Sequence, residues 1–295
     1  MENLLNCPVC EGSSFEIHHT STDYTVSGKT FDVQKCNSCG FLFTNPRPSQ
    51  AEIGPFYESK DYISHSNSKK GLFNKVYQQV RDIAIHQKTD LISKLTGLDG
   101  LSLLDIGCGT GEFLAGCKAK GWSVRGVEPG NAAREQAITN HGLQVTGEEY
   151  LNKSTDSYDV ITMWHVLEHV HDLNPRIDQV YRLLKREGVL IIAVPNHTSY
   201  DASAYGKYWA AWDVPRHLYH FSPATIKKLL LKHGFRHTGS YPMKFDAYYV
   251  SLLSEGYTKG KKQNVFGLLK GFRSNIAANK NAEKYSSVIY VFKKS

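Results

Sequence analysis

Residues 103–111 read Leu103-Leu104-Asp105-Ile106-Gly107-Cys108-Gly109-Thr110-Gly111, an apolar run that enters a glycine-rich turn. Glycines allow the backbone to approach a ligand at torsion angles that other residues avoid. Glu112–Lys120 has the pattern of a helix, and Ser123–Glu128 has the pattern of a second strand that ends in an acidic residue. This order of strand, turn, helix and strand is typical of a sheet that binds a nucleotide-like cofactor at the carboxyl ends of its strands.

The same alternation continues toward the C-terminus. We expect helices at Asn131–His141, Pro175–Arg186 and Pro223–His233, and further strands at Leu143–Thr146, Tyr158–Met163, Gly188–Val194, Phe235–Tyr241 and Ser286–Phe292. Alternating strands and helices predict a mostly parallel sheet that is covered on both faces. The fold class is therefore α/β, with a Rossmann-like core.

The spacing within the turn discriminates between two cofactor classes. A dinucleotide requires Gly-x-Gly-x-x-Gly with its pyrophosphate at the helix N-terminus, whereas this chain has Gly-x-Gly-x-Gly followed at once by Glu112, which opposes a pyrophosphate. Asp105 suits a cofactor with an amino group and a sulfonium, and Glu128 lies where an acidic side chain binds ribose hydroxyls. The electrostatics favour S-adenosylmethionine over a dinucleotide.

These motifs resemble the class I methyltransferases. The resemblance rests on the turn, on Val127-Glu128-Pro129, on Asp159-Val160-Ile161 and on His165-Val166-Leu167-Glu168-His169-Val170, and it is strongest for the subgroup related to ubiquinone-biosynthesis O-methyltransferases. Members with an N-terminal cysteine ribbon resemble nearly the whole chain, including Pro215–Leu218 and Ser286–Tyr290. The family implies a seven-stranded sheet whose last strand is antiparallel.

The resemblance also implies a set of cofactor-binding residues. Glu148 and Glu149, which follow the third strand, should lie near the adenine, and Trp164 and His165 should line the other side of the cofactor. Together with the turn and the second strand, the expected cofactor contacts are Asp105, Gly107, Cys108, Gly109, Gly111, Glu128, Pro129, Glu148, Glu149, Trp164 and His165.

Two Cys-x-x-Cys pairs, Cys7/Cys10 and Cys36/Cys39, flank a short expected hairpin. Paired knuckles of this kind are typical of a tetrahedral zinc site, and four thiolate ligands leave no open coordination position. A redox pair normally occurs once at the start of a helix, and disulfides are disfavoured inside the cell. The pattern therefore predicts a structural zinc ion.

The chain is expected to divide into three parts: a zinc ribbon at 1–48, a helical linker at 49–98 and the methyltransferase domain at 99–295. Within the third part, we expect an aromatic-rich acceptor insert at 196–222 and a basic segment at 255–285. Asn45-Pro46-Arg47-Pro48 interrupts regular structure and marks the first boundary.

The histidine-rich stretch His165-x-x-Glu168-His169-x-His171 has several interpretations. It matches the His-x-x-Glu-His pattern of inverted zinc peptidases, but those motifs lie within a helix and this one follows a strand. Some class I O-methyltransferases resemble it with Glu at the position of His165 and use a catalytic divalent ion, although magnesium prefers oxygen ligands. In the third interpretation, Glu168 ties the loop together and His165 faces the pocket.

Methyl transfer to a hydroxyl requires removal of a proton, and histidine suits that task. His165, His169, His217 and His220 are the candidate bases. His217 lies among the aromatic residues of the insert, which form either an acceptor pocket or a lid core with a hydrogen-bonded histidine.

Composition limits the partners of the chain. Its net charge is +7, and nine Lys or Arg residues face a single acid between Lys259 and Lys294. A solvated basic surface is the simplest interpretation, although peripheral membrane contact through the basic tail is an alternative. The chain shows no secretory signal and no apolar run long enough to span a bilayer, so we expect a cytoplasmic protein without nucleic acid as a partner.

The sequence thus predicts an S-adenosylmethionine-dependent methyltransferase that acts on a small molecule or glycan precursor, with O-methylation favoured over C- or N-methylation. The acceptor is expected to be quinone-like or a saccharide. One alternative is a nucleic-acid or protein methyltransferase that uses the ribbon and the basic tail for recognition. A non-catalytic interaction module and a dinucleotide oxidoreductase are further alternatives.

Overall fold

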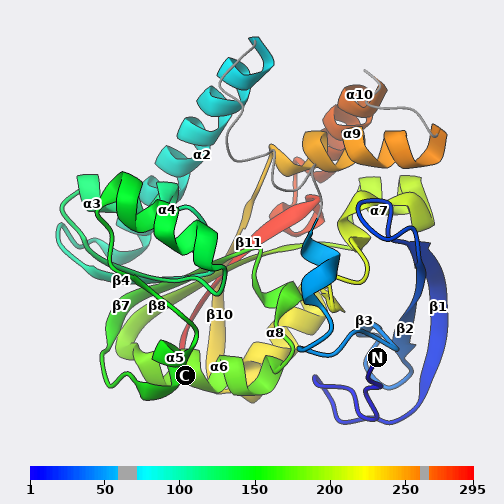
Figure 1. Cartoon of the computed structure of the whole chain (residues 1–295), viewed down its shortest axis with the longest axis horizontal. Coiled ribbons are helices and arrows are strands. Elements are labelled where there is room, and N and C mark those ends of the chain that lie inside the picture. The colour runs from blue at the N-terminus through cyan, green and yellow to red at the C-terminus, as the bar shows by residue number, and fades with distance from the viewer. Residues whose placement is uncertain (59–71, 260–265) are drawn as a thin grey trace.

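The computed structural model describes residues 1–58, 72–259 and 266–295. Parts of the expected linker (59–71) and of the expected basic segment (260–265) lie outside the described residues. The described strands form two sheets, one of seven strands and one of four (Figure 1).

The larger sheet has the order β10-β11-β8-β7-β4-β5-β6. Its strands are β4 Ser102–Ile106, β5 Ser123–Val127, β6 Val145–Thr146, β7 Tyr158–Trp164, β8 Leu184–Pro195, β10 Phe235–Pro242 and β11 Ser287–Lys294. The pairs β4–β5, β4–β7, β5–β6 and β7–β8 are parallel, whereas β11 is antiparallel to both β8 and β10. The prediction of a seven-stranded, mostly parallel sheet with an antiparallel last strand is confirmed.

Side chains of each strand alternate between two cores, because successive residues of a strand point to opposite faces. On β4, Leu103 belongs to the core beneath α2 Leu72–Thr96, α3 Glu112–Ala119 and α4 Asn131–His141, and Leu104 belongs to the opposite core. That opposite core is covered by α5 Glu149–Lys153, α6 Leu173–Leu183 and α8 Pro223–Lys232 (Figure 1). The sheet is thus covered on both faces, as its apolar runs predict.

The largest difference between the expected and the observed boundaries lies at the junction of α6 and β8. We expected a helix through Arg186, but α6 ends at Leu183 and β8 begins at Leu184. The first residues of β8 after Leu184 are the exposed Lys185, Arg186 and Glu187. Charged, exposed residues occur both at helix ends and at strand starts, so the sequence did not distinguish the two. The expected helix end at Gly142 is confirmed, where a left-handed residue (φ 59°) caps α4.

The smaller sheet joins the N-terminal segment to the aromatic-rich insert. Its strands are β1 Phe15–Thr22, β2 Thr30–Cys36, β3 Leu42–Thr44 and β9 Tyr219–His220, in that order and all antiparallel. Because β9 belongs to the insert, Leu42 pairs with His220 and Phe43 pairs with Tyr219. The insert also holds α7 Tyr200–Tyr205 and the 3-10 turns η3 Gly206–Tyr208 and η4 Ala210–Trp212.

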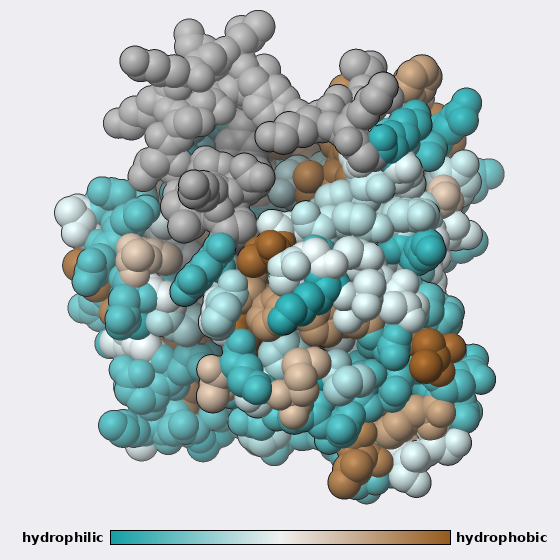
Figure 2. Space-filling view, turned by 45° about the vertical axis from the view of Figure 1, so that its right-hand side comes forward, coloured by the Kyte–Doolittle hydropathy of each residue, from teal (hydrophilic) through white to brown (hydrophobic). Residues whose placement is uncertain are grey.

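Two helices follow β10. From the sequence, we described this region only as a basic segment and did not predict them. These are α9 Asp246–Lys259 and α10 Phe266–Ala278, which pack against each other. Gly267 and Gly271 allow the close approach, since a Cβ atom at either would lie 2.7 Å from the backbone of α9. The remaining short elements are η1 Gly54–Tyr57, η2 Leu167–His169 and η5 Ala282–Lys284. The face toward the viewer in Figure 2 is mainly hydrophilic, with apolar residues in small separate groups.

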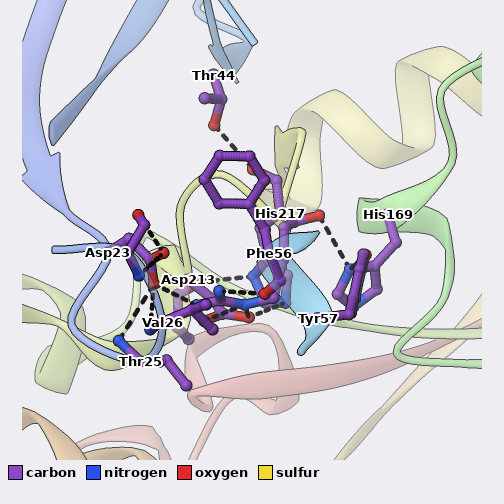
Figure 3. A network of polar contacts seen from close by, with 12 residues as sticks. Asp23, Thr25, Val26, Thr44, Phe56, Tyr57, His169, Asp213 and His217 are labelled. Atoms are coloured by element: carbon purple, nitrogen blue, oxygen red, sulfur yellow. Dashed lines mark hydrogen bonds and ion pairs between the residues drawn. The ribbon is translucent and has the colours of Figure 1, made fainter. Parts of the chain in front are cut away.

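A buried ion pair connects the smaller sheet to the insert. The Arg216 guanidinium donates to Asp23 at 3.0 Å, to Asp213 at 2.6 Å and to the Phe56 carbonyl at 2.9 Å (Figure 3). Burial opposes the ionisation of Asp23, but hydrogen bonds from Ser27 and the charge of Arg216 together lower its pKa. Arg216 is 1% exposed, so its charge depends on these partners.

We expect Arg216→Ala to lower the free energy of unfolding by about 3–5 kcal/mol, because Asp23 would remain buried without its partner charge. Urea denaturation followed by tryptophan fluorescence measures the change. Lys232→Ala, which removes the exposed ion pair with Glu11, is the control and should change little. A loss for Arg216→Ala no larger than that of the control would contradict the proposed importance of the buried pair.

Candidate functional site

The glycine-rich turn lies between β4 and α3, as expected. Gly107, Gly109 and Gly111 all have positive φ, at 72°, 54° and 87°. A Cβ atom on Gly107 would lie 2.4 Å from Val166, whereas at Gly109 no atom lies within 4 Å of that position. The turn is therefore packed against Val166 at Gly107 and is open at Gly109. This opening suits a ligand that approaches the main chain.

Glu128 directly follows β5 and contacts this turn. Its two carboxylate oxygens accept hydrogen bonds from the backbone N–H groups of Gly109 and Gly130, both at 2.9 Å. Ile106 pairs with Val127 in the parallel register, so the turn and Glu128 emerge from the sheet at the same level. Pro129, the next residue, is exposed. The structure thus brings the predicted turn and the predicted acid together.

Asp105 lies beneath the turn, where it is 2% exposed and accepts a hydrogen bond of 2.6 Å from Thr162. Burial raises the pKa of Asp105 to about 7, against the opposing effects of the Thr162 hydrogen bond and the Lys88 charge. A cation bound near Asp105 would therefore favour the ionised carboxylate.

Lys88 is a residue of this site that the sequence interpretation missed. It extends from α2 so that its ammonium lies 4.2 Å from the centre of the Trp164 ring. Burial lowers the pKa of Lys88, while the charges of Asp105 and Asp246 raise it. A signal was present, since Lys88 lies at helical spacing between Ile85 and Ile92 on the apolar face of the helix.

The remaining predicted cofactor contacts lie around the carboxyl ends of the same strands. Trp164 is half-buried and packs edge-on against Phe113, with ring centres 5.4 Å apart. Glu148 accepts a hydrogen bond of 2.6 Å from Arg176, whereas Glu149 is exposed at the start of α5. Cys108 is buried behind the turn, next to Gly126.

His165 lies just beyond β7 with a left-handed backbone (φ 56°). Its Nδ1 lies 3.2 Å from Glu168 and its Nε2 lies 2.9 Å from Asp246, the first residue of α9. Burial disfavours charge on the ring, but the two carboxylates outweigh burial and raise the pKa of His165 to about 10. An imidazolium held in this way cannot accept a proton near neutral pH, which weighs against His165 as a base.

His169 and His217 lie in edge-to-face contact, with ring centres 4.6 Å apart (Figure 3). Nδ1 of His169 is 3.0 Å from the Arg216 carbonyl and 3.1 Å from the Tyr57 hydroxyl, and Nδ1 of His217 is 2.8 Å from the Ala211 carbonyl. Burial, followed by the neighbouring His217, lowers the pKa of His169 to about 4. His220 is separate from this pair and contacts Thr44 at 3.1 Å.

The four predicted metal-ligand cysteines converge. Their sulfur atoms all lie within 4.8 Å of one another, and none of the four forms a disulfide. Backbone N–H groups of Ser38 and Cys39 point at the Cys36 thiol, and they help to lower its pKa to about 7 although burial opposes this. Those of Val9 and Cys10 point at Cys7. The donor set fits a tetrahedral ion.

Comparison with known proteins identifies the family. Residues 77–238, more than half of the chain, match a family described as "Methyltransferase domain". This chain belongs to that methyltransferase family.

Individual relatives cover only part of this chain. It is 35% identical to a ubiquinone biosynthesis O-methyltransferase of Glaesserella parasuis over 118 residues, which is 36% of this chain and 50% of the relative. The corresponding protein of Aeromonas salmonicida is 31% identical over 130 residues, or 41% of this chain and 53% of the relative. The chain therefore spans about half the length of the curated relatives it matches.

Solved structures show the same fold at low sequence identity. A SAM-dependent methyltransferase from Archaeoglobus fulgidus is 20% identical, with a TM-score of 0.50, over 76% of this chain and 100% of its own. Phosphoethanolamine N-methyltransferase 2 of Haemonchus contortus is 17% identical, also with a TM-score of 0.50, over 71% of this chain and 52% of its own. The core thus has the class I methyltransferase fold. None of the described helices is long and apolar enough to cross a membrane.

Asp105 makes the stability of this protein depend on pH. In the folded state its carboxyl retains its proton up to a higher pH than in the unfolded state, because burial raises its pKa. The contribution of the protonated carboxyl to the free energy of unfolding is therefore complete below pH 3.8 and is lost as the pH rises to about 7. We expect Asp105→Asn to gain stability relative to the wild type across this range, by roughly 4 kcal/mol at pH 8. Urea denaturation at a series of pH values measures the difference. Glu135→Gln, at an exposed acid of α4, is the control, and parallel pH profiles for wild type and Asp105→Asn would refute the assignment.

Proposed function

We propose that this chain is an S-adenosylmethionine-dependent methyltransferase that acts on a small molecule or glycan precursor. The observation that carries the proposal is the turn at Gly109, which is open in front and flanked by Glu128 and Asp105. The family and the solved structures support it, because the Haemonchus contortus enzyme is described in complex with S-adenosyl-L-methionine.

The residues of this edge fit the cofactor chemically. Glu128 keeps lone pairs for ribose hydroxyls, and Asp105 offers a negative charge to the amino group of the methionine portion. Lys88 provides a positive charge for its carboxylate. Pro129, Glu148 and Glu149 lie on the side of β5 and β6 where the adenine is proposed to bind. When bound, S-adenosylmethionine supplies a methyl group attached to a sulfonium, and the protein aligns the acceptor with it.

We propose that the acceptor loses its proton on the side of the site where His169 and His217 lie. His165 is less suited, because Asp246 and Glu168 hold its proton. We propose that His165 instead orders the loop after β7 and the start of α9. Trp209 and Trp212 donate their indole N–H groups to Asp201 and to the Gly206 carbonyl, so these two indoles support the insert as core residues rather than stacking on an acceptor.

O-methylation of a quinone-like acceptor is the favoured chemistry, and a saccharide is the alternative. The relatives named ubiquinone biosynthesis O-methyltransferase support the first. A nucleic-acid substrate would instead require binding that weakens steeply with salt, and an RNA-binding titration at two salt concentrations distinguishes it. A non-catalytic role would follow only if the chain failed to bind the cofactor.

We expect Glu128→Ala to weaken the binding of S-adenosylmethionine about 10- to 100-fold, because hydrogen bonds to the charged carboxylate would be lost. Isothermal titration calorimetry measures the dissociation constant. Glu135→Ala, an exposed acid on α4, is the control and should bind as the wild type does. Equal binding by both variants, or tight NAD binding by the wild type, would exclude the proposed site.

We further propose that Cys7, Cys10, Cys36 and Cys39 hold a structural zinc ion. Cys36→Ser should release this ion and lower the midpoint of thermal unfolding, because so small a segment depends on its metal. Thiolate-to-cobalt absorption of the cobalt-loaded protein and elemental analysis measure the loss. Cys117→Ser, which changes a buried cysteine outside the cluster, should retain the ion. Retention of thiolate-bound metal by Cys36→Ser would contradict the ligand set.

A further inference from the structure

We infer that the contact between β1 and the aromatic-rich insert is a pH-sensitive switch, in which the histidines around Trp212 must stay uncharged for the two parts to remain packed. The ring centre of His19, in β1, lies 4.4 Å from that of Trp212, and the ring centre of His220, in β9, lies 5.0 Å from it. His197, just after β8, stacks on the same indole at 6.2 Å. Histidines from three separate segments thus surround one side chain of the insert.

The Trp212 indole is buried and held in place. It is 4% exposed, and its Nε1–H group donates to the Gly206 carbonyl at 2.8 Å. Trp209 packs edge-on against it, with ring centres 5.3 Å apart. Because the indole is fixed on these sides, a change in the charge of the imidazoles must be accommodated by movement of the segments that carry them.

His19 and His197 share a buried nitrogen without a partner. The Nε2 atom of each ring has no hydrogen-bond partner among the described residues. A protonated imidazole carries an N–H group on both nitrogens, so either ring would bury a charged donor without an acceptor. Burial of an unpaired charge costs far more than burial of a neutral polar atom. The geometry therefore favours the neutral form of both rings.

Charged groups of β1 and β2 face His19. Asp32 of β2 favours a proton on His19, whereas His18, with a ring centre 5.2 Å from that of His19, disfavours one. Glu16 and Lys35 act on His18 with opposite signs and form an exposed ion pair with each other at 3.1 Å. Burial, followed by His18, outweighs Asp32 and lowers the pKa of His19 to about 4.

Other histidines face the remaining two rings. Burial, followed by the charges of His18 and His19, lowers the pKa of His197 to about 4. Burial also lowers the pKa of His220, and His217, with the other three histidines, adds to this effect. An indole face attracts one imidazolium, but several imidazolium ions at this contact would repel one another.

The direction of the pH dependence follows from these shifts. A histidine of the unfolded chain titrates near pH 6.5, whereas His19 and His197 of the folded chain stay neutral down to about pH 4. Their contribution to stability is therefore complete above pH 6.5 and is lost as the pH falls from 6.5 to about 4. The switch depends on packing, and it does not depend on whether the chain transfers methyl groups.

The position of β1 makes the effect local. β1 pairs with β2 at the edge of the smaller sheet that is farthest from β9. It contacts the insert through side chains, His19 with Trp212 and the Ser21 hydroxyl with the Lys207 carbonyl at 3.1 Å. Proton uptake thus acts on a contact that β-sheet pairing does not reinforce. The glycine turn and Glu128 belong to the larger sheet and should keep their structure.

Urea denaturation of the full chain at pH 7.5 and pH 5.0, followed by tryptophan fluorescence, tests the switch. The shift of each pKa from 6.5 to about 4 lowers the folding equilibrium constant roughly 30-fold per ring at the lower pH. The loss in the double variant His19→Gln/His197→Gln should therefore be at least 30-fold smaller than in the wild type. His86→Gln, at an exposed histidine of α2, is the control and should lose as much as the wild type. Equal losses in the double variant and the wild type overturn the inference.

Two measurements on the wild type keep the test independent of how well the variants fold. Histidine C2–H resonances, assigned from the single variants, should titrate well below pH 6.5 for His19 and His197, and titration near 6.5 overturns the inference. Amide hydrogen exchange, corrected for the intrinsic effect of pH, should accelerate at pH 5.0 in β1 and the insert more than in β7. Equal acceleration in β1 and β7 would show global unfolding and would exclude a local switch.

Discussion

The parallel register of three strands is the constraint on which the rest of the site depends. Ile106 of β4 pairs with Val127 of β5 on one side and with Met163 of β7 on the other. The residues that follow these three positions therefore leave the sheet side by side. The glycine turn, Glu128 and the loop of His165 come together for this reason, although about 60 residues of sequence separate the first from the last. A shift of one residue in either pairing would turn one of these groups to the opposite face of the sheet.

A second constraint couples the N-terminal segment to the insert. The β3–β9 pairing extends the smaller sheet into the insert, and Arg216 binds Asp23 from the other side of that junction. His217 follows Arg216 directly, and the Thr44 hydroxyl donates to its carbonyl at 2.8 Å. The position of His217 beside His169 thus depends on contacts with the cysteine-containing segment. A zinc ion that fixes the cysteine-containing segment would therefore help to hold His217 in place without contacting it.

Much of the fold could be predicted from the sequence because its signals are local. Apolar alternation, the glycine spacing and the acid that follows β5 predict a mostly parallel sheet with a cofactor-binding turn, and the paired cysteines are adjacent in each knuckle. The seven strands and the antiparallel last strand were implied by the family resemblance. β9 was not predictable, because two residues carry no periodic signal and their partner lies far away in the chain. Asp246 was missed for the same reason, since only the tertiary fold places the start of α9 against His165. Lys88 differs, because its place on an apolar helical face was a local signal.

The chemistry of the histidines shows most clearly what composition alone leaves open. His165, His169 and His217 are equivalent as residue types, yet their partners separate them. Two carboxylates hold a proton on His165, whereas backbone carbonyls occupy one nitrogen of each of the other two rings. A ring between two acids is a cation, and a ring that donates to a carbonyl offers a lone pair at its other nitrogen. Glu168 lies near both kinds: one of its oxygens contacts the charged ring of His165, and a carboxylate oxygen lies within 4.8 Å of a ring nitrogen of His169 and of His217. The two histidines of the His-x-x-Glu-His pattern therefore differ: His165 forms an ordering ion pair, and His169 is bonded to a backbone carbonyl. This difference depends on α9 and the insert rather than on the motif itself.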